Sequence, residues 1–135
     1  MVQPVILTYD TKDTFAFNIT STETIVAGDL CIASGGYVYK MDGATYAATF
    51  AGLALDSSAS GETTDVAVAW KCVAEIDVGS ASYRIPAGLK YTSANTLVDD
   101  AGSNTVAWVA ENTSSATRLR VLVNALELAS FEKNA

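Results

Sequence analysis

The sequence predicts an all-β fold, a small β-barrel or sandwich built from two similar β units, with an N-terminal arm or extra strand. Three observations predict it. Apolar residues recur with a period of two rather than 3.6. The runs are short and are separated by turns rich in Gly, Asp and Ser. The pattern also occurs twice along the 135 residues, a length that suits one domain.

Residues 1–20 lie before the repeat and hold two apolar stretches, Val5–Tyr9 and Phe15–Ile19. Alternation in the second stretch predicts a strand with Phe15 and Phe17 on one face. Strand addition uses main-chain hydrogen bonds and needs little sequence specificity. The segment is therefore either an arm that adds a strand to a neighbouring subunit or the first strand of the barrel.

The repeat defines one β-barrel domain at residues 21–124, with units 25–77 and 85–124. Three pairs of segments carry the repeat: 27–30 with 87–90, 36–39 with 95–98, and 51–60 with 107–116. In this alignment Trp108 takes the place of Gly52, and we expect Trp108 in the core. Two such units closing on each other would make a small barrel with pseudo-twofold character.

Each unit closes on a long strand. In residues 65–77, one face carries only apolar or small residues: Val66, Val68, Trp70, Cys72, Ala74 and Ile76. This alternation predicts either a long half-buried strand or a strand bent in its middle, with Trp70 toward the core. In the second unit, Leu119, Val121 and Val123 alternate in the same way. The tail, 125–135, suits a short helix or a last strand.

The composition argues against catalysis and nucleic-acid binding. The formal net charge is −7, whereas phosphate binding needs Lys and Arg. The chain has no His, which removes Ser-His-Asp and Cys-His machinery and His-ligated metal sites. We therefore predict no enzyme activity, no catalytic residues, no cofactor and no metal. No apolar stretch is long enough to span a bilayer. Met1–Pro4 has no secretory signal pattern, so we expect Cys31 and Cys72 to be buried thiols.

Several motifs resemble those of a family of tailed-phage and prophage proteins known as capsid decoration, cement or head-stabilising proteins. They are V-A-G-D-L at 26–30, G-G-x-V-x-K at 35–40, F-A-G-L-A-L-D-S-S-A-S-G-E at 50–62 and I-P-A-G-L-K-Y at 85–91. Some members are labelled recombinases, but the chain has no G-x-x-x-x-G-K-[ST] loop. The resemblance covers residues 26–123.

The resemblance implies a small β-barrel structural protein of the virion, made in the host cytoplasm and placed on the capsid exterior of a bacteriophage. Its partners would be the major capsid protein and itself, as a homotrimer or alternatively a dimer, with no nucleic acid and no membrane. Five residues are candidates for the oligomer or capsid interface: Val5, Leu7, Tyr9, Arg118 and Arg120. The two arginines alternate outward on the last strand of an acidic chain, as interface cations would.

Two other classes of function remain open. One is another virion structural protein, of the tail tube or a head fibre. The other is a carbohydrate-binding β-module, which expects a row of exposed aromatic side chains. The tyrosines that would supply it are Tyr37, Tyr39, Tyr46, Tyr83 and Tyr91.

Overall fold

The structure, a computed structural model, describes residues 3–43, 49–62, 65–99 and 104–125, and within them it is all-β. A 3-10 turn, η1 (Thr11–Asp13), joins the first two strands. The strands are β1 (Val5–Tyr9), β2 (Thr14–Phe17), β3 (Leu30–Ser34), β4 (Tyr37–Lys40), β5 (Phe50–Ala54), β6 (Val66–Ala69), β7 (Lys71–Tyr83), β8 (Gly88–Ser93), β9 (Thr96–Asp99), β10 (Thr105–Val109) and β11 (Thr113–Asn124).

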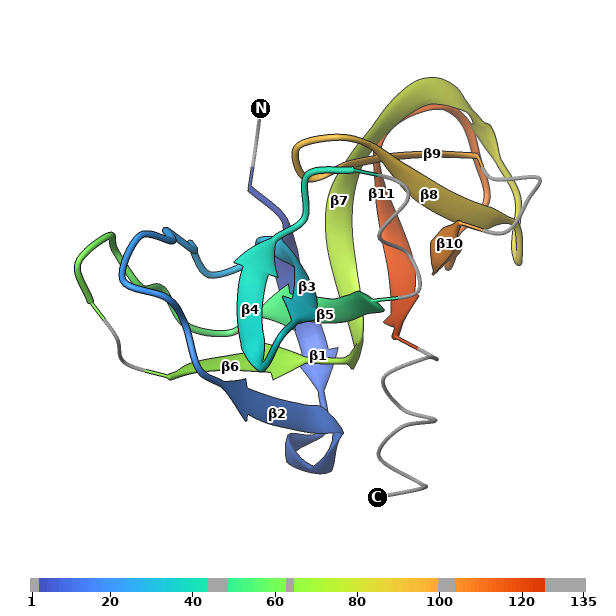
Figure 1. Cartoon of the computed structure of the whole chain (residues 1–135). Helices are drawn as coiled ribbons and strands as arrows, with labels where there is room; N and C mark the ends of the chain where they lie inside the picture. Colours follow the sequence, from blue (N-terminus) through green and yellow to red (C-terminus); the bar gives the residue numbers. More distant parts are fainter. Residues whose placement is uncertain (1–2, 44–48, 63–64, 100–103, 126–135) are drawn as a thin grey trace.

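The strands form a closed barrel, named the second barrel, and a five-stranded sheet whose ends meet in one isolated bridge, named the first barrel. The two lie side by side in Figure 1. The second barrel has the order β7-β11-β10-β8-β9, and β9 closes it by pairing in parallel with β7. The first has the order β2-β6-β5-β3-β4. A single parallel bridge from Asn18 to Tyr37 links its two ends. β1 is an extra strand, antiparallel to β7. The all-β barrel prediction is confirmed.

The two barrels have the same topology, and their registers agree except that the β8–β9 ladder skips Thr92 where the β3–β4 ladder is regular. The sequence of pairings β2-β6-β5-β3-β4 in the first corresponds, strand by strand, to β7-β11-β10-β8-β9 in the second. Each has one residue that the ladder skips at the same place, Ala51 in β5 and Val106 in β10. The Asn18–Tyr37 bridge falls at the position of the Asp77–Thr96 pair.

The barrel interiors correspond residue by residue. The buried cluster inside the first barrel consists of Ile19, Ile25, Cys31, Val38, Ala51, Ala54, Val66 and Val68. The register places them at Val78, Tyr83, Leu89, Leu97, Val106, Val109, Leu119 and Val121, all buried in the second cluster. Side chains of the second barrel are bulkier at most of these positions. The second interior therefore buries more apolar surface, the main source of folding free energy.

Of the two alternatives for residues 65–77, the structure has the bent one: the chain leaves the first barrel at Ala69 and enters the second at Lys71. Trp70 lies at the bend and packs against the large core. The backbone crosses closely over Gly52, whose φ is +123°. A Cβ on Gly52 would lie 2.0 Å from the carbonyl oxygen of Ala69, so only glycine fits this crossing.

The structural units are longer than the repeat that the sequence indicates. They span 14–69 and 71–124, because β2 and β7 each begin a unit. The Phe-rich β2 and the long β7 share no sequence pattern, so the repeat was visible only after them. Residues 1–20 contain both the extra strand β1 and the first strand of a barrel. Ala125 is buried, and the rest of the tail, 126–135, lies outside the described residues.

Candidate functional site

The five predicted interface residues lie on neighbouring strands but not on one face of the sheet. β1, which carries Val5, Leu7 and Tyr9, pairs with β7, and β7 pairs with β11, which carries Arg118 and Arg120. Ladder neighbours are about 5 Å apart and share a face of the sheet. Val5 is opposite Glu75 and shares the outer face with the two arginines, whereas the ladder skips Leu7, and Tyr9 is opposite the buried Cys72.

Two rows of side chains cross the outer face of this half-sheet. The first is Val5–Glu75–Arg120. The second is Thr8–Val73–Leu122–Trp108. The exposed fractions are 47 % for Val5, 48 % for Leu7 and 36 % for Leu122. These rows define the outer face of the second barrel as an apolar surface with an acid and a base in it. Exposed apolar surface with an edge of charge is typical of interaction sites.

The expectation that Trp108 lies in the core is wrong. Trp108 is partly exposed and pairs with the exposed Leu122, so it belongs to the outer face. The sequence alignment was one residue out of register. By strand pairing, Trp108 corresponds to Leu53, and Gly52 corresponds to Ala107. A side chain one position along a strand points to the opposite face.

One of the two corresponding rows of the first barrel is covered. Leu30, Leu53 and Ala69 form the row equivalent to Leu122 and Trp108, and each is 0 % exposed. They belong to the large core cluster, together with the interior of the second barrel. The other row, Ala16–Ala67, is open as Glu75–Arg120 is, so the two barrels differ in the Leu122–Trp108 row alone.

The two arginines have different environments. The Arg118 guanidinium donates to Asp77 at 2.9 Å and lies 3.7 Å from a Glu75 carboxylate oxygen. It also donates to the Gln3 carbonyl at 3.1 Å, which ties the segment before β1 to β11. Arg120 is exposed, and within the described residues its guanidinium forms no ion pair. Arg118 is therefore engaged within the subunit, whereas the charge of Arg120 faces solvent.

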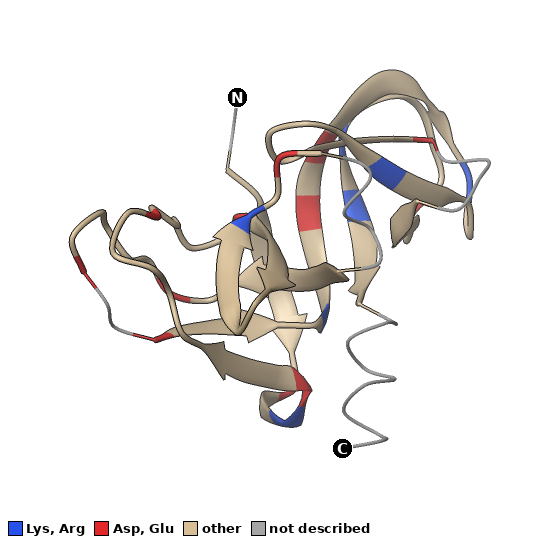
Figure 2. Ribbon diagram, in the orientation of Figure 1, with Lys and Arg blue, Asp and Glu red and all other residues tan. Residues whose placement is uncertain are grey.

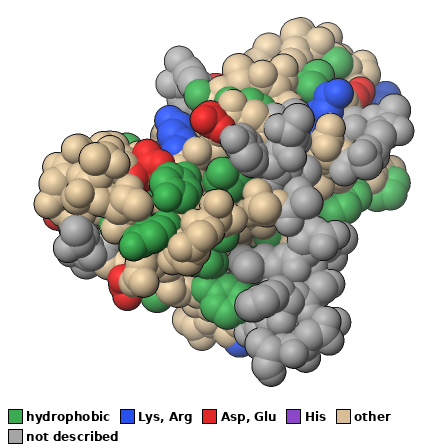
Figure 3. All heavy atoms as spheres, viewed as in Figure 1, with side chains coloured by type: hydrophobic (Ala, Val, Ile, Leu, Met, Phe, Trp, Pro, Cys, Tyr) green, Lys and Arg blue, Asp and Glu red, His purple; other side chains and the backbone are tan. Residues whose placement is uncertain are grey.

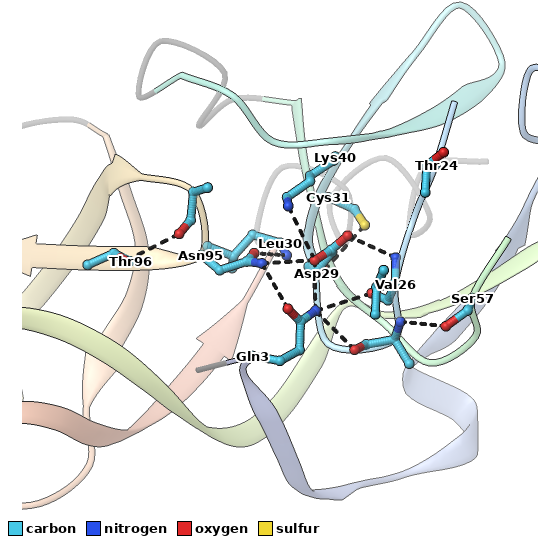
Figure 4. A network of polar contacts seen from close by, with 12 residues as sticks. Gln3, Thr24, Val26, Asp29, Leu30, Cys31, Lys40, Ser57, Asn95 and Thr96 are labelled. Carbon is cyan, nitrogen blue, oxygen red and sulfur yellow. Dashed lines mark hydrogen bonds and ion pairs between the residues drawn. The ribbon is translucent and has the colours of Figure 1, made fainter. Parts of the chain in front are cut away.

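A buried polar network between the barrels was not predicted (Figure 4). Asp29, 1 % exposed, precedes β3, and Asn95, 2 % exposed, lies in the β8–β9 turn. The Asn95 amide donates to Asp29 at 2.8 Å, and its oxygen accepts the Leu30 N–H at 2.9 Å. Gln3 donates to Asp29 at 2.7 Å. The network joins both barrels and the N-terminal segment at one point.

Within the sequence, the only local feature that points to this network is an asparagine at a turn, Asn95. Asn95 has a φ of +53°, a conformation in which Asn is common at turns. Its partner Asp29 is distant in sequence, so no short-range pattern connects them. Lys40, at the end of β4, lies 3.7 Å from the same carboxylate. The network leaves each of these polar groups with a partner, as buried groups require.

The described residues contain no arrangement that suggests catalysis or metal binding. No group of three Cys, Asp or Glu side chains is placed there to hold an ion. Cys31 and Cys72 are free and buried, as predicted. Burial raises the pKa of the Cys72 thiol to about 12 and raises that of Cys31 further. Neither thiol is a nucleophile near neutral pH, because the thiolate is the reactive form.

No helix among the described residues has the length and apolarity to cross a membrane. In comparisons with known proteins, the sequence matches no family model and no curated protein.

Proposed function

We propose that the protein is a capsid decoration protein, which binds the outer surface of a phage head as a symmetric oligomer and stabilises the shell. The motifs that resemble the decoration family first suggest it. The observation that carries the proposal is the outer face of the second barrel. It exposes Leu122 and part of Trp108, whose counterparts in the first barrel, Ala69 and Leu53, are fully buried. A surface of this kind suits a large, flat partner such as an assembled shell.

The chemistry of the outer face supports a docking role. Trp and Arg are the residues that most often dominate binding energy at interfaces. Arg120 lies beside Leu122 on β11 and offers a guanidinium to a carboxylate on the shell. The net charge of −7 keeps copies soluble and opposes non-specific binding to nucleic acid.

Stabilisation would follow from avidity. Each subunit would contribute a modest contact, and a symmetric oligomer would engage several capsomers at once. Binding to the expanded shell alone shifts the shell equilibrium toward that state, because a ligand favours the form that it binds. No chemical step is needed for this role.

The test is co-sedimentation of the purified protein with expanded head shells of the phage that encodes it. Leu122→Glu should weaken binding at least tenfold, because it buries a charge in the apolar row. Ser115→Glu is the matched control, an exposed position on the same strand outside the two rows, and should bind as the unchanged protein does. Absence of shell binding, together with absence from virions by mass spectrometry, would refute the proposal.

A carbohydrate-binding module is the second candidate, on one observation. A hollow on the first barrel is lined by Tyr39 and Ile32 together with the polar residues Glu23, Lys40 and Asp42. An aromatic ring beside carboxylates is a common way to hold a sugar. Tyr83 is in the core, so the row of aromatics is incomplete. A glycan array distinguishes the two functions, and Tyr39→Ala would abolish any signal from this hollow.

A further inference from the structure

Among the described residues three strands end a sheet: β1, β2 and β4, of which β4 has only the isolated bridge to Asn18. Of these, β1 and β2 are not protected by charge. β1 ends the larger sheet and β2 ends the smaller one. Their sequences, VILTY and TFAF, contain no charged residue. In Figure 2 both strands are drawn in tan, and the η1 turn that joins them carries blue and red. Monomeric proteins usually protect an edge strand with charge, proline or a covering segment.

The backbone of β2 offers hydrogen-bonding groups along its free edge. The Asn18 carbonyl accepts the Val38 N–H at 3.0 Å on the side away from β6. Because backbone groups alternate along a strand, those of Ala16 and Thr14 point to the same side as those of Asn18. The closing bridge stops at Asn18, so the edge from Thr14 to Ala16 stays open within the described part of the chain.

The side chains of β2 are also incompletely covered. Phe15 and Phe17 are partly exposed, and their rings meet edge to face with centroids 6.0 Å apart. Their counterparts by register, Ala74 and Ile76, are both 0 % exposed. Figure 3 shows hydrophobic side chains on the surface of the first barrel over β2 and β4. The first barrel is therefore unfinished at the place where the second is closed.

The second barrel shows what belongs on such an edge. There β1 pairs with residues 72–75 of β7, just before the point where β9 closes the barrel. By register, residues 72–75 correspond to residues 13–16, the open edge of β2. A strand with the sequence of β1 thus already occupies the equivalent position within the same chain. The β1–β7 pairing therefore points to an extended, uncharged strand of this protein as the occupant of the β2 edge.

We propose that the open edge of β2 pairs with the free edge of β1 from a second copy of this chain. β1 would then lie between β7 of its own subunit and β2 of the next, in one sheet that continues across the contact. The inference deepens the proposed function, since it names the contact that builds the symmetric oligomer, and it rests on that oligomer existing.

The contact uses one edge from each barrel, so it joins two different surfaces of the subunit. Such contacts close into rings when the rotation between subunits allows it. A closed ring pairs every β1 with a β2, so neither of these two edges is left bare to start aggregation. A second copy therefore fits better than a foreign strand, because the chain supplies both halves of the contact in equal number.

Disulfide cross-linking tests the pairing directly. Two single variants, Leu7→Cys on β1 and Ala16→Cys on β2, are prepared, mixed and oxidised. Both positions are exposed, and the native thiols are buried and so stay unreactive. We expect a dimer-sized band on a denaturing gel from the mixture and not from either variant alone. Cross-links in a single variant, or none in the mixture, would overturn the proposal.

The oligomeric mass gives an independent readout. Native mass spectrometry should show a closed oligomer, and Ala16→Lys, which places a charge on the β2 edge, should reduce its population at least tenfold. Ala59→Lys, at an exposed loop position, is the control and should assemble fully, with circular dichroism confirming that both variants fold. A monomeric unchanged protein, or an Ala16→Lys oligomer of undiminished population, would contradict the inference.

The two proposals can fail separately. If the oligomer forms by β1–β2 pairing but does not sediment with shells, the decoration function is wrong and the contact stands. If the protein binds shells while cross-linking between Leu7→Cys and Ala16→Cys fails, the decoration function stands and the proposed contact is wrong.

Discussion

The two barrels share every strand pairing but differ in how each is finished. The second has a two-residue parallel closure, bulkier interior side chains and a covering strand, β1. The first has a single bridge and an open edge, and it is instead supported by the second barrel on its outer face. The same arrangement of strands can thus be stabilised in two ways, by closure within the barrel or by packing against the neighbouring barrel. Substitutions at matched positions test this difference.

The largest effect is expected at the crossing between the barrels. Gly52→Ala would place a Cβ 2.0 Å from the Ala69 oxygen and 2.8 Å from the Trp70 Cα, in a backbone conformation that favours glycine. We expect a loss of at least about 3 kcal/mol in the free energy of unfolding, from overpacking and strain together. Urea denaturation followed by circular dichroism measures it.

The matched substitution is Ala107→Gly, since Ala107 holds the position of Gly52 in the second barrel. Ala107 is 0 % exposed in a regular strand, so removing its methyl group should cost only about 1 kcal/mol. Equal losses for the two substitutions would show that the barrels do not differ at this position, and that the close crossing has no special role.

The next largest effect is expected in the buried network. Asn95→Gly keeps the left-handed backbone but removes the donor to Asp29 and the acceptor for the Leu30 N–H. The Leu30 N–H is then left unpaired and the buried Asp29 carboxylate loses one of its donors, while Gln3 and the Val26 N–H still donate to it. These losses should lower the free energy of unfolding by about 2 kcal/mol. Gly36→Asn is the control, at the corresponding turn of the first barrel, where the glycine meets nothing within 4 Å. A loss from the control as large as from Asn95→Gly would point to turn geometry rather than to the network.

Local patterns predicted the strands and their bend, and also which of the strands repeat. Alternation located β2, β4, β6 and β11, and the face shared by Val66, Val68 and Trp70 already indicated a break in one long strand. These features depend on neighbours in sequence. The candidate site was harder to predict. Trp108 was expected in the core and not on the outer face because the repeat alignment was wrong by one residue, and segments rich in Ala, Ser and Thr do not fix the alignment to a single residue.

Contacts between residues far apart in the chain could not be predicted from the sequence. Arg118 was expected at an interface, but its ion pair with Asp77 and its bond to Gln3 join segments far apart in the chain. The partnership of Asp29 with Asn95 is of the same kind. A single sequence carries no signal for such pairs, because their geometry follows from the assembled fold and not from local spacing.

A smaller effect is expected from pH, through one buried thiol in each of the two clusters. The thiol of Cys72 has a pKa of about 12 when folded, against 9.0 ordinarily, and burial also raises that of Cys31. Above pH 9 the unfolded chain loses these protons and the folded chain keeps them. Their contribution to stability is therefore full below pH 9 and declines as the pH rises toward 12.

The thiol contribution is measured against a double variant, Cys31→Ala with Cys72→Ala. At pH 9.5 the unchanged protein should lose about 1.6 kcal/mol more than the double variant, relative to pH 7.5, with about half of it from each thiol. The single variants then show which barrel holds the deeper thiol, which the burial predicts to be Cys31 in the first. An identical decline in all four proteins would mean that neither thiol resists ionisation.

The smallest effect distinguishes the two arginines and tests how β1 is held on the second barrel. Arg118→Ala should cost about 1 kcal/mol, because its ion pairs are partly exposed and screened by solvent. Arg120→Ala should change stability by less than about 0.5 kcal/mol, as surface substitutions usually do. Hydrogen exchange at the β1 amides gives the sharper readout: it should quicken in Arg118→Ala alone, since only Arg118 binds the Gln3 carbonyl before β1. The register places Asp65, not an arginine, at the corresponding position of the first barrel. Faster exchange in Arg120→Ala as well would mean that the strand is held by the charge of β11 and not by the bond to Gln3.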